Sequence, residues 1–118
     1  MTRRPDGALE RDVLAVLWAA ERALLPAEVN ERIGGGHAYT SVATVLTRLH
    51  TKGLVQRQSA GRGFAYTTVY DESELAARRI GEVLTSSSDR SKVLAQFVGG
   101  LSTRDAAVLR RMLEQGRG

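Results

Sequence analysis

The sequence predicts a mainly α-helical protein with one small β-hairpin. Apolar residues recur every three or four positions along most of the chain, which is the spacing of amphipathic helices. This spacing is interrupted once, by two short segments rich in β-forming residues on either side of the loop Gly61-Arg62-Gly63. The character of the chain changes again after Tyr70. We therefore expect one domain over residues 1–70 and a helical region over residues 71–118.

The first two helices are predicted from their apolar stripes and from Pro26. The first should cover roughly residues 7–20, with Asp6 as its N-cap. Pro26 suits the first turn of a second helix, because the N–H that proline lacks would have no partner there. This second helix should end at about Ile33, before three consecutive glycines. The two leucines that precede Pro26 are expected to form a very short strand.

The third helix should begin at Thr40 or Ser41, since either hydroxyl is a good N-cap, and end at Gly53. Its expected core residues have the spacing i, i+3, i+4 and i+7: Val42, Val45, Leu46 and Leu49. Residues 54–60 and 64–69 are the expected strands. Three helices followed by a hairpin with a glycine-rich tip is the element order of a winged helix-turn-helix.

The residues after Tyr70 predict three short helices. Asp71 and Glu74 have the spacing of a capping box, a serine run breaks the first stripe, and Ser102 should begin the last helix. Helices of this size do not fold alone, so we expect them to pair with a second copy of the chain; packing against the first domain is the alternative. The apolar residues assigned to the dimer contact are Ile80, Leu84, Leu94, Phe97, Val98, Leu109, Met112 and Leu113.

Composition excludes several classes of protein. The chain has no cysteine, which excludes disulfides, cysteine-based zinc sites and thiol catalysis. The polar N-terminus resembles no signal peptide, and no run approaches the ~18 apolar residues of a membrane span, so a cytoplasmic protein is expected. His37 and His50 have no nearby cysteine or carboxylate in the sequence with which to form a triad or a metal site. We expect no enzyme, no cofactor and no metal.

The charge pattern favours a polyanionic partner. Net charge is +4, and no Asp or Glu occurs from Arg32 to Tyr70 although the chain has 13 acidic residues. The side of the third helix opposite its core residues carries Ser41, Thr44, Arg48 and Thr51, with Thr47 and Lys52 beside them. Small hydroxyls allow close approach to base edges, and the basic side chains reach phosphate or guanine. A merely solvated basic surface is the alternative.

Four motifs resemble the penicillinase-repressor family, BlaI/MecI/CopY. They are G-x-L-E-R-x-V-x-x-V-L-W at residues 7–18, A-Y-T-S-V-x-T-V-L-x-R-L-x-x-K-G-L-V at 38–55, G-R-x-x-x-Y at 61–66, and L-x-x-F-V-x-x-L-S at 94–102. The resemblance implies a homodimeric transcriptional repressor that binds a pseudo-palindromic operator with TACA/TGTA-type half-sites. The DNA-contact positions that match are Thr40, Ser41, Thr44 and Arg48, with Lys52 and Arg62 as backbone contacts.

The resemblance also implies a way of releasing the DNA. In the antibiotic-responsive branch, a membrane sensor protease leads to cleavage just before a Phe, and the matching bond here is Gln96–Phe97. Better-known members have Asn before that Phe, so this chain departs from the pattern. Beta-lactam response genes would be the regulated targets. The copper-responsive branch carries Cys pairs, and the lack of cysteine excludes that mode of sensing.

The sequence is also compatible with two other functions of a winged-helix domain. A regulator that senses a small ligand usually needs longer helices to enclose a pocket. A protein-interaction module often has an acidic or neutral third helix, and its binding would not be lost at high salt as DNA binding is.

Overall fold

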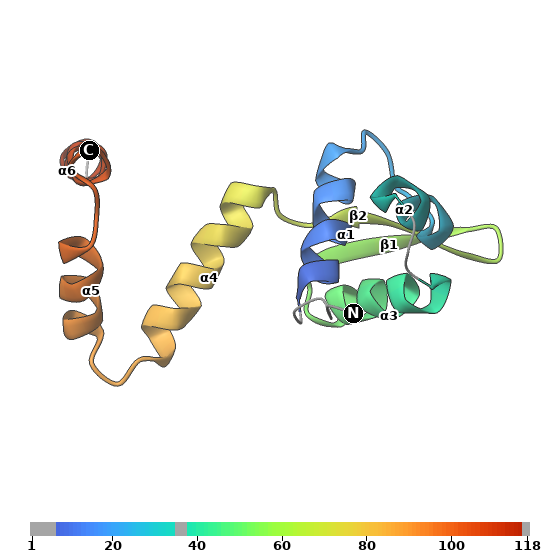
Figure 1. Ribbon diagram of the computed structural model, residues 1–118, viewed down its shortest axis with the longest axis horizontal. Helices are drawn as coiled ribbons and strands as arrows, with labels where there is room; N and C mark the ends of the chain where they lie inside the picture. Colours follow the sequence, from blue (N-terminus) through green and yellow to red (C-terminus); the bar gives the residue numbers. More distant parts are fainter. Residues whose placement is uncertain (1–6, 35–37, 117–118) are drawn as a thin grey trace. The chain divides into compact units, whose positions relative to one another are not determined.

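The computed structural model describes residues 7–34 and 38–116, so the predicted Asp6 N-cap and His37 lie outside the described residues. Within these residues the chain forms six helices and two strands (Figure 1). They are α1 (Ala8–Ala19), α2 (Pro26–Ile33), α3 (Tyr39–Thr51), β1 (Val55–Ala60), β2 (Gly63–Thr68), α4 (Glu72–Ser86), α5 (Arg90–Gly99) and α6 (Thr103–Gln115). The predicted mainly α-helical fold with a hairpin is confirmed. The chain divides into two compact units, Met1–Leu75 and Ala76–Gly118.

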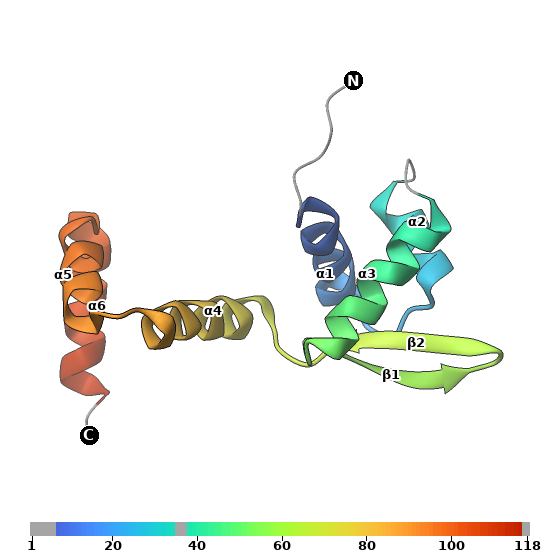
Figure 2. The same ribbon diagram turned by 90° about the horizontal axis from the view of Figure 1, so that it is seen from below.

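The first unit has one apolar core, enclosed by α1, α2, α3 and the hairpin. Figure 2 shows the three helices on one side of the hairpin. The fully buried side chains of the core come from both helices and loops: Val13, Leu14, Leu24, Val29, Val42, Leu46 and Leu49. Val55 of β1 and Tyr66 of β2 join the same core from the sheet. The buried face of α3 is the predicted one, because three of its four expected core residues are fully buried.

The start of α3 differs from the prediction. Ala38 is the N-cap residue and makes no side-chain cap hydrogen bond, whereas Thr40 and Ser41 already lie inside the first turn. The extended backbone of Ala38 aims its carbonyl at the N–H groups of Ser41 and Val42, at 3.0 and 3.4 Å. Backbone geometry therefore begins the helix without a hydroxyl. The predicted end is confirmed, since Gly53 has φ 79, a conformation that favours glycine.

The hairpin is a tight antiparallel pair. Its register runs from Val55 opposite Thr68 to Ala60 opposite Gly63, and Gly61 turns the chain with φ 63. Leu24 forms an isolated bridge to Tyr66, with the two backbone N–H···O bonds at 3.1 and 2.8 Å. The predicted very short strand before α2 is therefore present as a single bridge.

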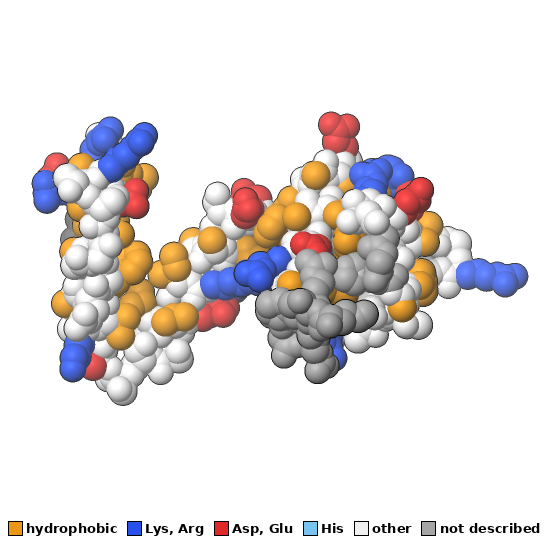
Figure 3. Space-filling model, in the orientation of Figure 1, with side chains coloured by type: hydrophobic (Ala, Val, Ile, Leu, Met, Phe, Trp, Pro, Cys, Tyr) orange, Lys and Arg blue, Asp and Glu red, His pale blue; other side chains and the backbone are white. Residues whose placement is uncertain are grey.

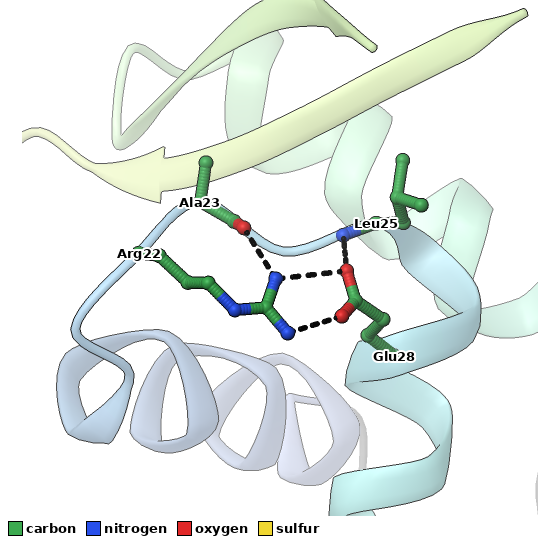
Figure 4. Close-up of polar contacts among 4 residues, drawn as sticks. All are labelled: Arg22, Ala23, Leu25 and Glu28. Atoms are coloured by element: carbon green, nitrogen blue, oxygen red, sulfur yellow. Dashed lines mark hydrogen bonds and ion pairs between the residues drawn. The ribbon is translucent and has the colours of Figure 1, made fainter. Parts of the chain in front are cut away.

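An ion pair between Arg22 and Glu28 closes the turn that leads into α2 (Figure 4). One carboxylate oxygen of Glu28 accepts a hydrogen bond from Leu25 N at 2.9 Å, and the Arg22 guanidinium donates to both oxygens. Arg22 also donates to the Ala23 carbonyl at 3.2 Å. The hydrogen bond from Arg22, followed by the one from Leu25, lowers the pKa of Glu28 from 4.5 to about 2.

Glu28→Gln should remove part of the protein's acid sensitivity. The pKa of Glu28 is lower in the folded chain than in the unfolded chain, so its charged form stabilises the fold above about pH 4.5. This contribution is lost as the pH falls from there towards 2. We expect wild type to have the higher melting temperature at pH 6 and to lose that advantage over Glu28→Gln by about pH 2. Melting followed by circular dichroism measures the difference.

The control for this experiment is Glu31→Gln, which removes an acidic residue of the same helix outside the Arg22 contact. It leaves the Arg22–Glu28 ion pair in place, so it should not reproduce the lower melting temperature of Glu28→Gln at pH 6. A gap between wild type and Glu28→Gln that stays constant from pH 6 to pH 2 would contradict the assigned pKa shift.

The predicted helix caps after Tyr70 are present. Asp71 and Glu74 form a reciprocal capping box, with N–H···O distances of 2.9 and 2.8 Å. Ser102 caps α6 by accepting from Asp105 N at 3.0 Å. Leu75 is buried in the core of the first unit, so the first turn of α4 belongs to that unit. The indole N–H of Trp18 strengthens this attachment by donating to the Tyr70 carbonyl at 2.9 Å.

The second unit exposes most of its apolar side chains. Neither α5 nor α6 buries any residue, and in α4 only Leu75 is buried. Figure 3 shows hydrophobic side chains at the surface of α4 and α5. In the part of the chain that the structure covers, no helix is long and apolar enough to cross a membrane.

Candidate nucleic-acid interface

One face of α3 is exposed and carries no acidic residue. The exposed side chains are those opposite the core stripe: Thr40, Ser41, Thr44, Thr47, Arg48 and Thr51. The residues that the sequence singled out on this helix therefore share a single accessible surface. They do so because the 3.6-residue repeat places Val42, Leu46 and Leu49 on the opposite, fully buried face.

Three threonine hydroxyls of this face, those of Thr44, Thr47 and Thr51, donate within the helix. Thr44 donates to the carbonyl of Thr40 at 2.8 Å, Thr47 to that of Ala43 at 3.0 Å, and Thr51 to that of Thr47 at 3.1 Å. A hydroxyl has one proton and two lone pairs, so each of these oxygens is left as an acceptor. The surface therefore offers hydrogen-bond acceptors, methyl groups and one guanidinium.

The two basic side chains at the end of α3 are in different states. Among the described residues, Arg48 makes no ion pair and its guanidinium is free to bind a ligand. Lys52 is 54% exposed, but its ammonium donates to both carboxylate oxygens of Glu10, at 3.1 and 3.4 Å. Residues 32–70 contain no acidic residue, but in the folded chain Lys52 of this segment contacts Glu10 of α1. The Lys52 ammonium is therefore already paired with a carboxylate, whereas the Arg48 guanidinium is not.

The hairpin adds further basic groups. Arg62 is exposed in the turn between the strands and makes no ion pair with any described residue. Figure 3 shows basic side chains at the hairpin end of the first unit. Arg57 of β1 lies over the ring of Phe64, with 4.2 Å from the guanidinium carbon to the ring centroid. Sequence reasoning missed this stack, and only the strand register could have indicated it.

The apolar residues assigned to dimer formation lie on α4, α5 and α6. Six of them are exposed in the single chain: Ile80, Leu94, Phe97, Val98, Met112 and Leu113. Leu84 and Leu109 are half-buried. Val83 is also exposed and was not in the predicted set. Single exposed apolar residues are ordinary, but a series of them on consecutive helices is typical of a surface that another chain covers.

The Gln96–Phe97 bond lies inside α5. Proteases cut extended backbone, so the helical conformation protects this bond while α5 is folded. Cleavage would first require local unfolding of α5, which buries none of its residues in the single chain.

A three-helix core, a tight hairpin and a third helix with one accessible face define the winged-helix class of DNA-binding proteins. The model of one family, the penicillinase repressors, matches residues 7–115. This chain belongs to the penicillinase repressor family, whose members are transcriptional repressors and not enzymes. It is accordingly a winged-helix transcriptional repressor.

This chain is similar to known proteins both in amino-acid sequence and in structure. The transcriptional regulator BlaI of Mycobacterium tuberculosis is 34% identical to this chain over 114 residues, which span 92% of this chain and 83% of BlaI. A MarR family protein from Bacillus stearothermophilus is similar in structure, with a TM-score of 0.47 and 21% identity. That similarity covers 97% of this chain and 74% of the other.

Proposed function

We propose that two copies of this chain repress transcription by occupying a pseudo-palindromic operator with TACA/TGTA-type half-sites. The observation that carries the proposal is the exposed, acid-free face of α3. In each protomer α3 lies in the major groove, where Thr40, Ser41 and Thr44 meet base edges near the start of the helix. Arg48 reaches a guanine or a phosphate further along.

The state of the hydroxyls supports this kind of half-site. Thr44 has its hydroxyl proton engaged within the helix, so its oxygen is left as an acceptor, and the exposed side chain also carries a methyl group. In the major groove, adenine N6 and cytosine N4 are donors, and thymine presents a methyl group. A half-site built from A·T pairs and one G·C pair offers all three partners.

Lys52 and Arg62 are proposed as contacts to the DNA backbone. Arg62 projects from the turn of the hairpin, where a wing meets the neighbouring groove or phosphates. Lys52 would exchange the Glu10 carboxylate for a phosphate. The Lys52 side chain is largely exposed whereas the Glu10 side chain is only 20% exposed, so water screens this ion pair only in part and the phosphate has to replace the attraction that Lys52 gives up.

The second unit is proposed to hold the dimer together. Its exposed apolar side chains on α4, α5 and α6 would be covered by the same surface of a second copy. A two-fold symmetric dimer matches the symmetry of a pseudo-palindrome, with one α3 for each half-site. Occupancy of the operator then excludes the transcription machinery. A single protomer would make only half of the base-specific contacts that the dimer makes with the operator.

Release is proposed to follow cleavage of Gln96–Phe97, with beta-lactam response genes as the regulated targets. This step is the one that the family resemblance implies, and α5 must unfold locally to allow it. Mass spectrometry of the chain recovered from beta-lactam-treated cells checks it. Fragments ending at Gln96 are expected, and an intact chain in induced cells would contradict the step.

The operator proposal is tested by fluorescence anisotropy with two labelled duplexes, one carrying the TACA/TGTA palindrome and one with the same bases scrambled. At near-physiological salt, wild type should bind the palindrome at least about a hundredfold more tightly. Arg48→Ala should weaken binding to the palindrome by about 1–3 kcal/mol per half-site, because Arg48 is the free guanidinium on the groove-facing side.

Two further variants separate base contacts from general charge. Arg62→Ala should weaken binding to both duplexes alike, since a backbone contact carries no sequence information. Arg111→Ala removes an exposed charge from α6 and should change neither affinity. Equal, weak binding of wild type to both duplexes would overturn the operator, and unchanged binding by Arg48→Ala would overturn the role of that residue.

A further inference from the structure

The Arg57–Phe64 stack on the hairpin has a defined geometry. Arg57 is opposite Tyr66 in the register, and Phe64 is opposite Ser59, so Arg57 and Phe64 are diagonal neighbours on one face of the sheet. The guanidinium carbon lies 4.2 Å from the ring centroid, within the range of a cation–π contact. The two side chains therefore form one unit that crosses both strands.

This stack contributes little to the core. Phe64 is 40% exposed and lies outside the core cluster, and Arg57 is exposed as well. Within residues 7–34 and 38–116, Arg57 makes no ion pair or hydrogen bond beyond the ring contact. A guanidinium that stacks through its face keeps its N–H donors available at its edge. The stack thus restrains the side chain without using its donors.

The stack also lies between the two surfaces already proposed to meet DNA. Arg57 is on the same face of β1 as Val55, which packs in the core with Leu49 of α3. Two residues further along the strand, Arg57 is on the helix side of the hairpin, between the end of α3 and the turn that carries Arg62. The distance along β1 from Arg57 to the turn is roughly 10 Å. Arg57 and Arg62 are therefore far enough apart to meet different phosphates.

We propose that Arg57, held on the Phe64 ring, is a phosphate subsite for the DNA backbone, and that Phe64 is its positioning residue. This inference rests on the proposed function, because it assumes that α3 and the wing tip bind one duplex. An Arg edge is suited to phosphate, since its parallel donors match two phosphate oxygens. Restraint by the ring lowers the conformational entropy that Arg57 loses on binding.

The test is a salt titration of binding to the palindromic and scrambled duplexes. Arg57→Gln should reduce the slope of log affinity against log salt by about 0.9 per protomer, and should weaken binding to both duplexes alike. Phe64→Leu keeps the charge, so the slope should stay near that of wild type while affinity falls ~2–5-fold per protomer. Phe64→Tyr keeps the ring and should bind like wild type.

The double variant Arg57→Gln/Phe64→Leu decides whether the ring acts through the guanidinium. Phe64→Leu should have no further effect once Arg57 is replaced. Arg111→Gln is the matched charge control and should leave the slope unchanged. Melting followed by Trp18 fluorescence confirms that each variant is folded; because Phe64 lies outside the core cluster and Arg57 is exposed, we expect only a small loss of stability.

The outcomes separate this subsite from the proposed function. If wild type prefers the palindrome but Arg57→Gln keeps the full slope, the subsite is wrong and the operator proposal stands. If Phe64→Leu costs the same with and without Arg57, the positioning role is wrong. If wild type shows no preference for the palindrome, the operator proposal is wrong. If the salt slope of Arg57→Gln is also unchanged on both duplexes, Arg57 does not bind a DNA phosphate and the proposed subsite is wrong too.

Discussion

Phe97→Ala is expected to turn the proposed dimer into monomers at low micromolar concentration. Phe97 is 51% exposed on α5 in the single chain, so its apolar surface is available to a partner. Burying a fully exposed side chain of this kind is worth about 1.5–3 kcal/mol; about half of Phe97 is still exposed, so each protomer loses about half of that value, and a symmetric dimer loses it twice. Dimer dissociation should therefore become at least about tenfold easier. Sedimentation equilibrium measures this directly.

The same variant should lose its binding to the palindrome at concentrations where wild type is bound, because each protomer then holds only one half-site. Lys92→Ala is the control, since Lys92 is an exposed polar residue of the same helix. It should stay dimeric and bind like wild type. A Phe97→Ala protein that remains fully dimeric at low micromolar concentration would show that Phe97 is not part of the dimer contact.

Leu46→Ala is expected to destabilise the first unit by about 2–5 kcal/mol. Leu46 is 0% exposed and packs in the core with Leu14 and Leu24, so truncation leaves a cavity under α3. Urea unfolding gives the change in free energy. Trp18, the only tryptophan of the chain, packs against this core and reports the unfolding of the first unit. Binding to the palindrome should fail at a lower temperature than in wild type.

The comparison for Leu46→Ala is Thr47→Ala, one residue further along α3. Thr47 is exposed, and its hydroxyl bonds only to the carbonyl of Ala43 in its own helix. Replacing it should change the free energy of unfolding by no more than about 0.5 kcal/mol. Equal losses in the two variants would mean that the buried and exposed faces of α3 are not distinct.

Several parts of the fold could be predicted because they depend on local spacing. The stripe of Val42, Leu46 and Leu49 placed the buried face of α3, and the opposite face with Arg48 followed from it. The capping box at Asp71 follows from the same kind of short-range pattern. The predicted start of α3 was wrong. The hydroxyls of Thr40 and Ser41 are both good N-cap groups, but the N-cap is Ala38, whose backbone carbonyl accepts the first helical hydrogen bonds.

By itself, then, the sequence determined the order of the helices and the hairpin, and which side of each helix is apolar. Only the tertiary structure decided which charged groups are available. Glu10 meets Lys52, 42 residues away, and the register of the hairpin brings Arg57 onto Phe64. The physical reason is range: hydrophobic periodicity is a property of neighbouring residues, whereas these contacts exist only once separate elements pack together. The sequence predicted a basic surface, and the packing left Arg48 free, tied Lys52 to an acid and restrained Arg57 on a ring.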